Sequence, residues 1–493
     1  MKNLMIHNKE QLLALLVGTS ISVAILIGIN GSLSSNLAFV FPVALFVGIL
    51  VCLVYKKKII DRYGLLTNLL ILLIATSFIG AAFLSLNVGF FSLFPYRILF
   101  IGIIFYMVLY GFLRNDVSIF LNKVSFKAPL LLLIIWLLYA ILSLIWVDSV
   151  GSAIKGIVLL GFGIGLVFLM VYMIRSKQAF INVFYIWIFM AVFLIAIGLA
   201  NHFFQIHLPI SRIYLASAYQ KMIPTSVFVN ENDFASFLSI TFFLFLAWFN
   251  QTRNLLVKAI SIGLMIISLY LILVTSARAN LLGIFFGSFI WFVFIARGTQ
   301  KIKIIVLAFM MLGAGLAAFP EKIEKAIDPI INELSSLNVP ADTSGGSVEI
   351  RLNLIKNGLY SVKETLGFGV GAGNAERFME NEGVFPTYGD YNVHNWWIET
   401  LTNYGFIIFL LYSCLYFSIV YHLYYYWRKA RDKNMKMLLE AFFMGMVVFS
   451  IASLGPSSIM GLNYHWLLIG LSICLINLNM LSNTESLTRR LRN

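Results

Sequence analysis

The chain has 493 residues, of which 60% are hydrophobic and 11% are charged, and its mean hydropathy is +0.92. These values lie far outside the range of soluble proteins, so the composition excludes a soluble enzyme and indicates a polytopic membrane protein. The net charge of +14 is therefore expected to reflect basic loops beside anionic lipid headgroups, and it does not indicate a nucleic-acid-binding protein.

Apolar runs of about 20 residues recur along the sequence, and a helix of that length crosses about 30 Å of hydrocarbon. The pattern predicts an all-α fold, a transmembrane helix bundle of about 12–14 spans with a long extracytoplasmic loop that contains amphipathic helices. The first run lacks a small-residue cleavage site, so no removable signal peptide is expected. In chain order the predicted spans are 11–29, 37–55, 64–86, 94–113, 128–146, 153–174, 179–199, 233–249, 255–274, 280–296, 304–319, 403–426, 437–454 and 465–481.

Basic residues are distributed unevenly between the two sets of loops that this topology creates. Most of the 35 lysines and arginines fall in one set of loops and near the two chain ends. Loops rich in Lys and Arg face the cytoplasm, so both termini are predicted to be cytoplasmic. The outer face then receives two long segments, 200–232 and 320–402.

The outer segments divide the chain into four parts. Residues 1–199 are predicted to form N-terminal transmembrane helices, and residues 200–319 combine the first outer loop with further spans. Residues 320–402 form the long extracytoplasmic loop, and residues 403–493 form C-terminal transmembrane helices and a cytoplasmic tail. The three cysteines all fall inside apolar spans, which predicts neither a disulfide framework nor a metal site. They are Cys52, Cys414 and Cys474.

The long outer loop is predicted to have internal order. Residues 320–334 suit a short amphipathic helix, and the Ser- and Gly-rich residues after them suit a flexible linker. A second helix is predicted where five apolar residues share one face, and it is expected to lie flat over the membrane domain. Those five are Leu352, Ile355, Leu359, Val362 and Leu366. The helix ends in GFGVGAG, which predicts a tight, backbone-exposed turn rather than a nucleotide-binding loop, because no strand precedes it.

Four of the six histidines are predicted to lie outside: His202, His207, His394 and His465. His394 is followed by Asn395, two tryptophans and an apolar helix. One interpretation is an aromatic belt that marks the depth of the lipid headgroups. Glu399 favours a functional site instead, because a carboxylate at membrane level is unfavourable unless it is paired or faces a polar cavity.

Arg278 lies in the stretch TSARAN at the start of a predicted span. Thr275 or Ser276 is the expected N-cap, which places Arg278 in the first helical turn, where the helix dipole is already positive. One interpretation is an arginine that extends to the headgroups. The other is a phosphate or diphosphate site made by the helix amides and the guanidinium together.

The shorter outer loop adds two cations, Arg212 and Lys221, before the stretch SVFVNENDFASF. Asn232 or Asp233 is the expected N-cap of the following span. Glu231 and Asp233 are an alternative pair of ligands for a divalent metal, but no further ligands lie near them in the sequence.

Four stretches resemble, in order, the motifs of the O-antigen ligase and polymerase superfamily. VHNWWIETLTNYGF resembles the family's His-Asn, nine residues, then Gly, with His394, Asn395 and Gly405 in place. Three residues beyond that glycine the family often has Gly, Thr or Tyr, whereas this chain has isoleucine. FVNENDFAS is similar to the family's Asn-Pro-Asn segment, with Glu231 replacing proline. TSARANLLG resembles its Ser-Arg segment, and the stretch beginning at Arg351 resembles its Arg-led helix that ends in Gly-x-Gly-x-Gly.

The resemblance implies a glycosyltransferase that acts on the outer face of a bacterial cytoplasmic membrane on a sugar chain carried by a polyprenyl diphosphate. It implies that arginines hold the donor diphosphate and that His394 acts on the acceptor hydroxyl as catalytic base. We expect Asn395 to orient the base or the acceptor, and Glu399 to support the site. A diphosphate is a good leaving group, so neither a metal nor another cofactor is expected. The candidate donor-binding residues are Arg278, Arg212, Lys221 and Arg351.

Within the family, a polymerase of lipid-linked repeat units for a cell-surface polysaccharide, such as a teichuronic-acid-like polymer, is favoured. A one-step displacement would invert the anomeric configuration. The alternatives are a ligase that moves a finished glycan to another acceptor, a flippase or transporter, and a structural partner in a polysaccharide assembly complex. The expected partners are the lipid-linked oligosaccharide, membrane lipids and other assembly proteins.

Overall fold

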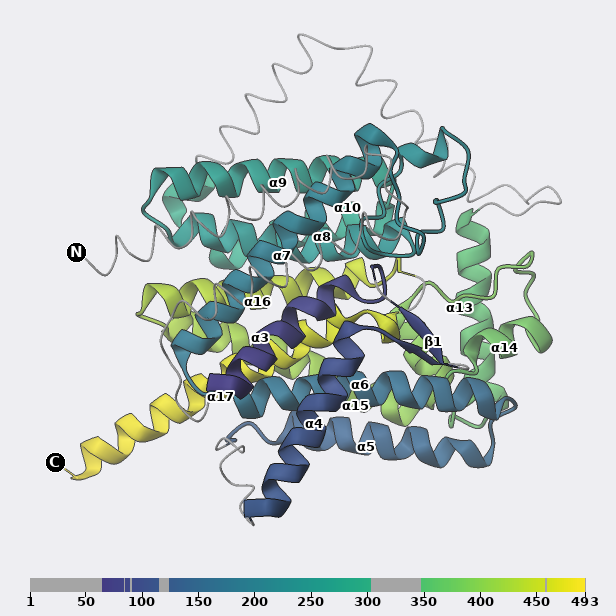
Figure 1. Cartoon of the computed structure of the whole chain (residues 1–493), viewed down its shortest axis with the longest axis horizontal. Coiled ribbons are helices and arrows are strands. Elements are labelled where there is room, and N and C mark those ends of the chain that lie inside the picture. The colour runs from purple at the N-terminus through teal and green to yellow at the C-terminus, as the bar shows by residue number, and fades with distance from the viewer. Residues whose placement is uncertain are drawn as a thin grey trace, which may run out of the picture.

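The computed structural model describes residues 64–83, 85–88, 91–114, 124–302, 347–456 and 459–492. Within them the regular secondary structure is helical except for one small antiparallel sheet (Figure 1). The elements are α3 (Gly64–Ile79), β1 (Leu86–Val88), β2 (Phe91–Leu93), α4 (Pro95–Arg114), α5 (Ala128–Leu142), η1 (Ser143–Ile145), α6 (Val150–Met173), α7 (Lys177–Phe204), η2 (Gln220–Met222), α8 (Glu231–Gln251), α9 (Leu255–Thr275), α10 (Arg278–Ile290), the π-helix η3 (Trp291–Ile295), α13 (Ser347–Glu364), α14 (Ala375–Asn381), α15 (Trp396–Lys429), α16 (Lys433–Ala452), η4 (Ile459–Gly461) and α17 (Asn463–Arg492).

Within the described residues, nine helices are long and apolar enough to cross a membrane, and each corresponds to a predicted span. The all-α, polytopic prediction is therefore confirmed. Cys414 and Cys474 are free thiols, the first exposed and the second buried. The other predictions for the N-terminal region and the long loop lie outside the described residues: the spans 11–29, 37–55 and 304–319, the helix 320–334 with its linker, and Cys52.

The predicted span 64–86 is too long at its C-terminal end. Helix α3 stops at Ile79, where Gly80 takes a left-handed φ of 58° and donates its N–H to the Thr76 carbonyl at 3.2 Å. A glycine in this conformation ends a helix without steric cost. The chain then forms the β1–β2 pair, with Leu86 opposite Leu93.

The bundle has a buried centre and a lipid-exposed periphery. Helices α7, α8, α16 and α17 are mostly buried, whereas only about a third of the apolar segment of α5, α9 and α10 is buried. The exposed side chains on these outer helices are large and apolar, for example Leu138, Ile266 and Phe285. In a membrane-spanning bundle such residues are the surface that faces the lipid tails.

Side-chain caps fix where most spanning helices begin. A capping hydrogen bond starts α6, α7, α9 and α16, from Ser149, Ser176, Asn254 and Asp432. Helix α8 is capped by Asn230, whose side chain accepts the N–H of Asn232 at 2.8 Å. The predicted caps Asn232 and Asp233 are therefore wrong, because the helix begins two residues earlier and contains both of them.

Helix α13 lies across one end of the bundle, at the right of Figure 1, while the spanning helices run lengthwise across the view. The orientation is the one expected for a helix parallel to the membrane surface. Its packing face was predicted wrongly, since Leu352 and Leu359 are exposed. Asn357 is buried instead and donates to the Phe385 carbonyl at 2.9 Å. At Gly358 a Cβ would lie 2.5 Å from a methyl carbon of Ile398, so glycine permits close packing on α15.

The glycine run after α13 docks on α15 through main-chain hydrogen bonds. Val370 and Gly371 donate their N–H groups to the carbonyls of Thr402 and Asn403, both at 2.9 Å. In return, Phe406 donates its N–H to the Gly367 carbonyl at 2.9 Å. The predicted tight turn is present, but much of it is packed against α15, so the prediction of an exposed backbone is wrong.

Candidate active site

The loop before α15 holds His394 at the end of the bundle covered by α13. His394 has a left-handed φ of 47°, and its main-chain N–H donates to Oδ1 of Asn392 at 3.1 Å. Its Nε2 lies 3.7 Å from Oδ2 of Asp390, which belongs to a turn in which the Asp390 N–H bonds the Thr387 carbonyl. The loop's own hydrogen bonds therefore orient the imidazole beside a carboxylate.

The residues after His394 anchor the loop to the bundle core. The Asn395 side chain accepts the N–H groups of Trp397 and Ile398 at 3.1 and 3.3 Å and so caps α15. Trp396 is 1% exposed, and its main-chain N–H bonds the Ser453 carbonyl at 3.1 Å. Because Trp396 lies in the core, it is not part of an aromatic belt. The predicted span start at residue 403 is also wrong, since this cap begins the helix at Trp396.

His394 lies between charges of opposite sign. Burial is the largest influence on its pKa and lowers it below the usual 6.5, with Arg351 and Arg212 acting in the same direction. The Asp390 carboxylate and the Gly455 carbonyl oppose this shift. Nδ1 is buried, and among the described residues it has no hydrogen bond of normal geometry. The ring is therefore neutral near pH 7, as a general base requires.

Gly455 links the histidine loop to two other helix starts. A Cβ at Gly455 would lie 3.4 Å from Nδ2 of Asn280, 3.7 Å from the Cβ of Ala279 and 3.8 Å from the Cβ of Asn232. Ala279 and Asn280 are in the first turn of α10, and Asn232 is in the first turn of α8. Two helix starts that lie more than a hundred positions before His394 in the sequence are thus close to the glycine beside it.

Arg278 is the first residue of α10 and is exposed. The predicted caps Thr275 and Ser276 are wrong: Ser276 has a left-handed φ of 56°, and Thr275 donates its hydroxyl to the Ile272 carbonyl at 2.7 Å. Ala277 occupies the cap position without a side-chain hydrogen bond. The first amides of α10 therefore lack a side-chain cap. They lie beside Ala279, which packs on Gly455.

Arg212 forms a bidentate ion pair with Glu231. Its Nε donates to Oε2 of Glu231 at 2.7 Å, and a second guanidinium nitrogen donates to Oε1. The hydrogen bond to Glu231 raises the pKa of Arg212. The pair fixes the loop 200–232 to the start of α8, and it occupies the carboxylate that the metal alternative required.

The remaining candidates are placed differently. No described interaction joins Lys221 to His394; the Lys221 carbonyl instead bonds the His207 ring at 2.8 Å. His202 bonds the Met222 carbonyl and the Tyr270 hydroxyl, at 2.7 and 2.8 Å. His465 is fully buried near the start of α17, where its ring stacks on Phe449 at 4.7 Å and meets the Trp396 ring at 4.8 Å, so it lies in the core at the same end of the bundle as the histidine loop.

Glu399 lies one turn into α15, where its main-chain N–H bonds the Asn395 carbonyl at 2.8 Å. Its charged neighbour is Glu376 of α14, whose carboxylate accepts from Asn392 at 2.8 Å. In the described part of the chain no hydrogen bond joins Glu399 to His394. Glu399 therefore lies in the same region as the histidine loop without contacting its imidazole.

Comparison of the sequence with known proteins shows the family to which the chain belongs. Residues 263–413 match the family model described as O-antigen ligase. The chain is also 35% identical over 407 residues to the teichuronic acid biosynthesis protein TuaE of Bacillus subtilis (strain 168), a match that covers 82% of this chain and 83% of the relative. The chain belongs to the O-antigen ligase family. It is thus a protein of membrane polysaccharide biosynthesis, in a family of glycosyltransferase- and ligase-type membrane enzymes.

The O-antigen ligase match begins in α9 and ends in α15, so it includes Arg278, Arg351 and His394. Two residues near the imidazole were not predicted. Asp390 precedes His394 by four residues, and that spacing was the available signal. Gly455 follows α16 in the dipeptide Gly-Pro. That dipeptide indicates the end of a helix, but it does not indicate that Gly455 lies near a histidine 61 positions earlier.

Proposed function

We propose that the chain is a polymerase that joins oligosaccharide repeat units carried on polyprenyl diphosphate, on the outer face of the cytoplasmic membrane. The product class is a cell-surface polysaccharide, and the relative named for teichuronic acid biosynthesis supports this class. The proposal includes the orientation with both termini in the cytoplasm, and the division into N-terminal helices, a first outer loop, a long outer loop and C-terminal helices.

One observation carries the proposal: a largely buried His394, 17% exposed, lies beside Asp390 and within electrostatic range of Arg351 and Arg212. Attack by a sugar hydroxyl requires a neutral base, and the departing diphosphate requires positive charge. A neutral imidazole within electrostatic range of two arginines, at the end of a membrane bundle, meets both requirements.

In the proposed reaction the acceptor hydroxyl oxygen forms a bond to the anomeric carbon of the donor. The hydroxyl proton passes to His394, and the bond between the anomeric carbon and the diphosphate oxygen breaks. The bonding electron pair leaves with the diphosphate, so no oxidant or reductant is required. Asp390 stabilises the imidazolium that forms, and a single displacement inverts the anomeric configuration. We propose no metal, because cationic side chains near the histidine can balance the leaving charge.

The donor diphosphate is assigned to Arg278 and Arg351. Arg278 begins α10, whose first amides have no side-chain cap, and Arg351 acts on the charge of His394 from α13. The guanidinium of Arg212 is bidentate to Glu231, so we assign it to positioning rather than to direct clamping. Lys221 has no described link to the histidine and is the weakest of the four candidates. Asn395 caps the helix that presents the base, and Glu399 is proposed to support the site.

The test uses purified full-length protein in detergent with a polyprenyl-diphosphate oligosaccharide as the only substrate. Longer lipid-linked chains and released polyprenyl diphosphate are expected. A ligase would leave this substrate unextended and consume it only when a different acceptor is added. A flippase would move the substrate across a vesicle membrane without forming a glycosidic bond, and that result would contradict the proposed function.

A further inference from the structure

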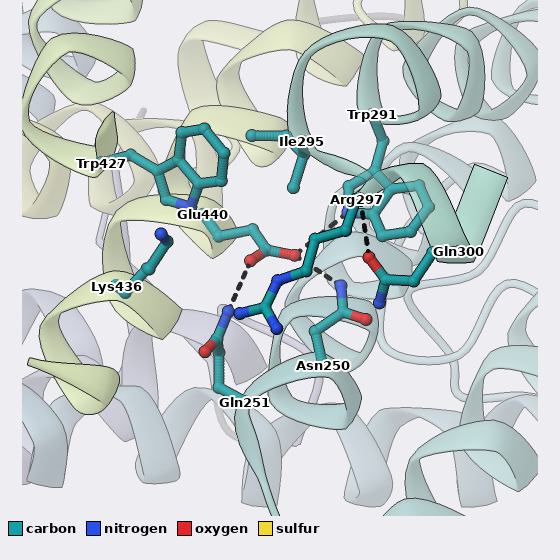
Figure 2. Close-up of a pocket in the computed structure, with 9 residues that line it drawn as sticks. All are labelled: Asn250, Gln251, Trp291, Ile295, Arg297, Gln300, Trp427, Lys436 and Glu440. Atoms are coloured by element: carbon teal, nitrogen blue, oxygen red, sulfur yellow. Dashed lines mark hydrogen bonds between the residues drawn. The ribbon is translucent and has the colours of Figure 1, made fainter. Parts of the chain in front are cut away.

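A polar cavity lies at the opposite end of the bundle from His394 (Figure 2). Helices α8 and α10 both begin near the histidine. At their other ends, Gln251 is the last residue of α8 and Trp291 directly follows α10, and both line the cavity. At 1.5 Å per residue the 21 residues of α8 span about 30 Å and the 13 residues of α10 about 20 Å, so the cavity is remote from the proposed reaction. Its volume is about 120 Å³.

The centre of this cavity is Glu440 of α16, which is 1% exposed. Three donors already fill its carboxylate: Asn250 to Oε1 at 2.6 Å, Trp291 to the same oxygen at 3.0 Å, and Gln251 to Oε2 at 3.1 Å. Trp291 begins the π-helix η3, a rare turn that directs its indole toward the carboxylate. Glu440 therefore holds Asn250, Gln251 and Trp291 in the cavity wall. Both of its carboxylate oxygens already accept hydrogen bonds from these residues.

The groups left for a ligand are donors and cations. The indole N–H of Trp427 is buried and has no hydrogen-bond partner among the described residues. Lys436 lies with its ammonium 4.9 Å from the Trp427 ring centre, and Arg297 extends over the cavity from the segment after η3. Figure 2 shows Trp427 and Lys436 together on one side of the Glu440 carboxylate and the Arg297 guanidinium on another. Two cations and one carboxylate leave the cavity with net positive charge.

We propose that this cavity binds a phosphate group, held by Arg297, Lys436 and the Trp427 indole N–H. A buried donor without a partner is unfavourable unless a ligand or water accepts from it, and phosphate oxygens accept from guanidinium, ammonium and indole alike. The cavity volume of about 120 Å³ is enough for one phosphate group. The phosphate belongs to either a lipid headgroup or free inorganic phosphate.

The site does not depend on the proposed transfer reaction, because its test measures binding alone. The full-length protein is purified in a phosphate-free detergent. One arm titrates inorganic phosphate against sodium chloride at equal ionic strength and follows thermal unfolding. The other arm titrates phosphatidylglycerol, with monoglucosyldiacylglycerol as the phosphate-free lipid, and follows retained lipid by native mass spectrometry.

Four charge variants and one donor variant decide the result. Arg297→Gln and Lys436→Gln remove the cavity cations, and each is expected to weaken binding of the effective probe about tenfold or more, the range for one charge-assisted hydrogen bond. Arg253→Gln and Lys433→Gln remove exposed cations at the same end that do not line the cavity, and they are expected to bind as the parent does. Trp427→Phe keeps the ring, loses the N–H and is expected to weaken binding less.

Retention of phosphatidylglycerol alone identifies a lipid headgroup as the source, and stabilisation by inorganic phosphate alone identifies a soluble one. The proposal is overturned if neither probe distinguishes the parent from the cavity variants. It is equally overturned if the Arg253 and Lys433 variants lose binding to the same extent, because the effect is then general surface charge. Stabilisation by Mg²⁺ instead of phosphate would assign the cavity to a cation held by Glu440.

Discussion

Gly405 of α15 lies against Gly367, so close that a Cβ at Gly405 would be 2.1 Å from the Gly367 carbonyl oxygen. Gly405 has φ 72° and ψ −176°, a backbone conformation that is open almost only to glycine. It kinks α15, and the Phe406 N–H that follows bonds the same carbonyl. This glycine contact acts together with the main-chain hydrogen bonds of Val370 and Gly371 to hold the end of α13 against α15.

Gly405→Ala is expected to destabilise the protein by on the order of 1–3 kcal/mol from backbone strain alone, before the clash with Gly367 is added. The measurement is the thermal unfolding midpoint of the purified protein. Gly263→Ala in α9 is the matched control, because nothing lies within 4 Å of a Cβ there. The control should be neutral or slightly stabilising, since alanine is the better helix former. Equal midpoints for the two variants would show that the kink does not depend on glycine.

The fold was largely readable from the sequence, because long apolar runs have few alternatives in a membrane. The predictions that were wrong concern local features, namely where a helix begins and which of its faces packs. The start of α15 was placed at residue 403 because the apolar run begins there, whereas Asn395 caps the helix before it. The packing face of α13 was assigned to its leucines, whereas Gly358 and Asn357 make the contact because small size and main-chain hydrogen bonds matter more at that surface.

His394→Ala is expected to lower turnover by ~10²–10⁴-fold, the usual effect of losing a general base. Donor binding should change little, because the arginines remain. His202→Ala is the matched control at the same end of the bundle, since its ring bonds Met222 and Tyr270 and not the proposed site. Initial rates of chain extension are compared after both variants are shown to insert and fold. Near-parental activity of a folded His394→Ala protein would remove the base from the mechanism.

The pH dependence of activity gives two predictions of opposite sign. The pKa of His394 is lowered by burial, so the base loses activity only when the pH falls below about 6.5. Asp390→Asn removes a charge that raises this pKa, and the acid limb should move to lower pH. Arg351→Gln removes a charge that lowers it, and the acid limb should move to higher pH. The profiles of kcat/KM are measured between about pH 4.5 and 8.5, about two units either side of the usual value. Shifts in the same direction for both variants would contradict the assignment.

The candidate site was only partly readable. His394, Arg278 and Arg351 stand in motifs with recognisable spacing, so the sequence could nominate them. Gly455 could not be nominated, because its role depends on how α16 ends beside α10, which no local pattern encodes. Arg212 was assigned to the donor from the family resemblance and from the bidentate contact that an arginine can make. Its partner Glu231 is 19 positions away, and only the folded loop shows that its guanidinium is already engaged.

Arg278→Lys should impair activity nearly as much as Arg278→Ala, because an ammonium cannot form the two parallel hydrogen bonds that a guanidinium makes with a diphosphate. The effect is expected mainly in donor affinity, read from KM for the lipid-linked substrate. Arg253→Lys, at the other end of the bundle, is the control and should behave as the parent protein. Full activity of Arg278→Lys would mean that only a point charge is needed at the start of α10.

The proposed orientation predicts which end of the bundle an impermeant thiol reagent reaches. The background is a variant with all three native cysteines replaced by serine. Ser217→Cys, exposed in the loop before α8, should react in intact cells or in spheroplasts. Thr299→Cys, exposed beside the cavity of Glu440, should react only after lysis. Ser217 precedes the start of α8, near His394, and Thr299 follows the far end of α10 and η3. The two substitutions therefore report on opposite ends of the described bundle, and one experiment gives its orientation. If Thr299→Cys were labelled first, His394 would face the cytoplasm and the outer-face transfer would have to be abandoned, whereas the phosphate site would remain open to its own test.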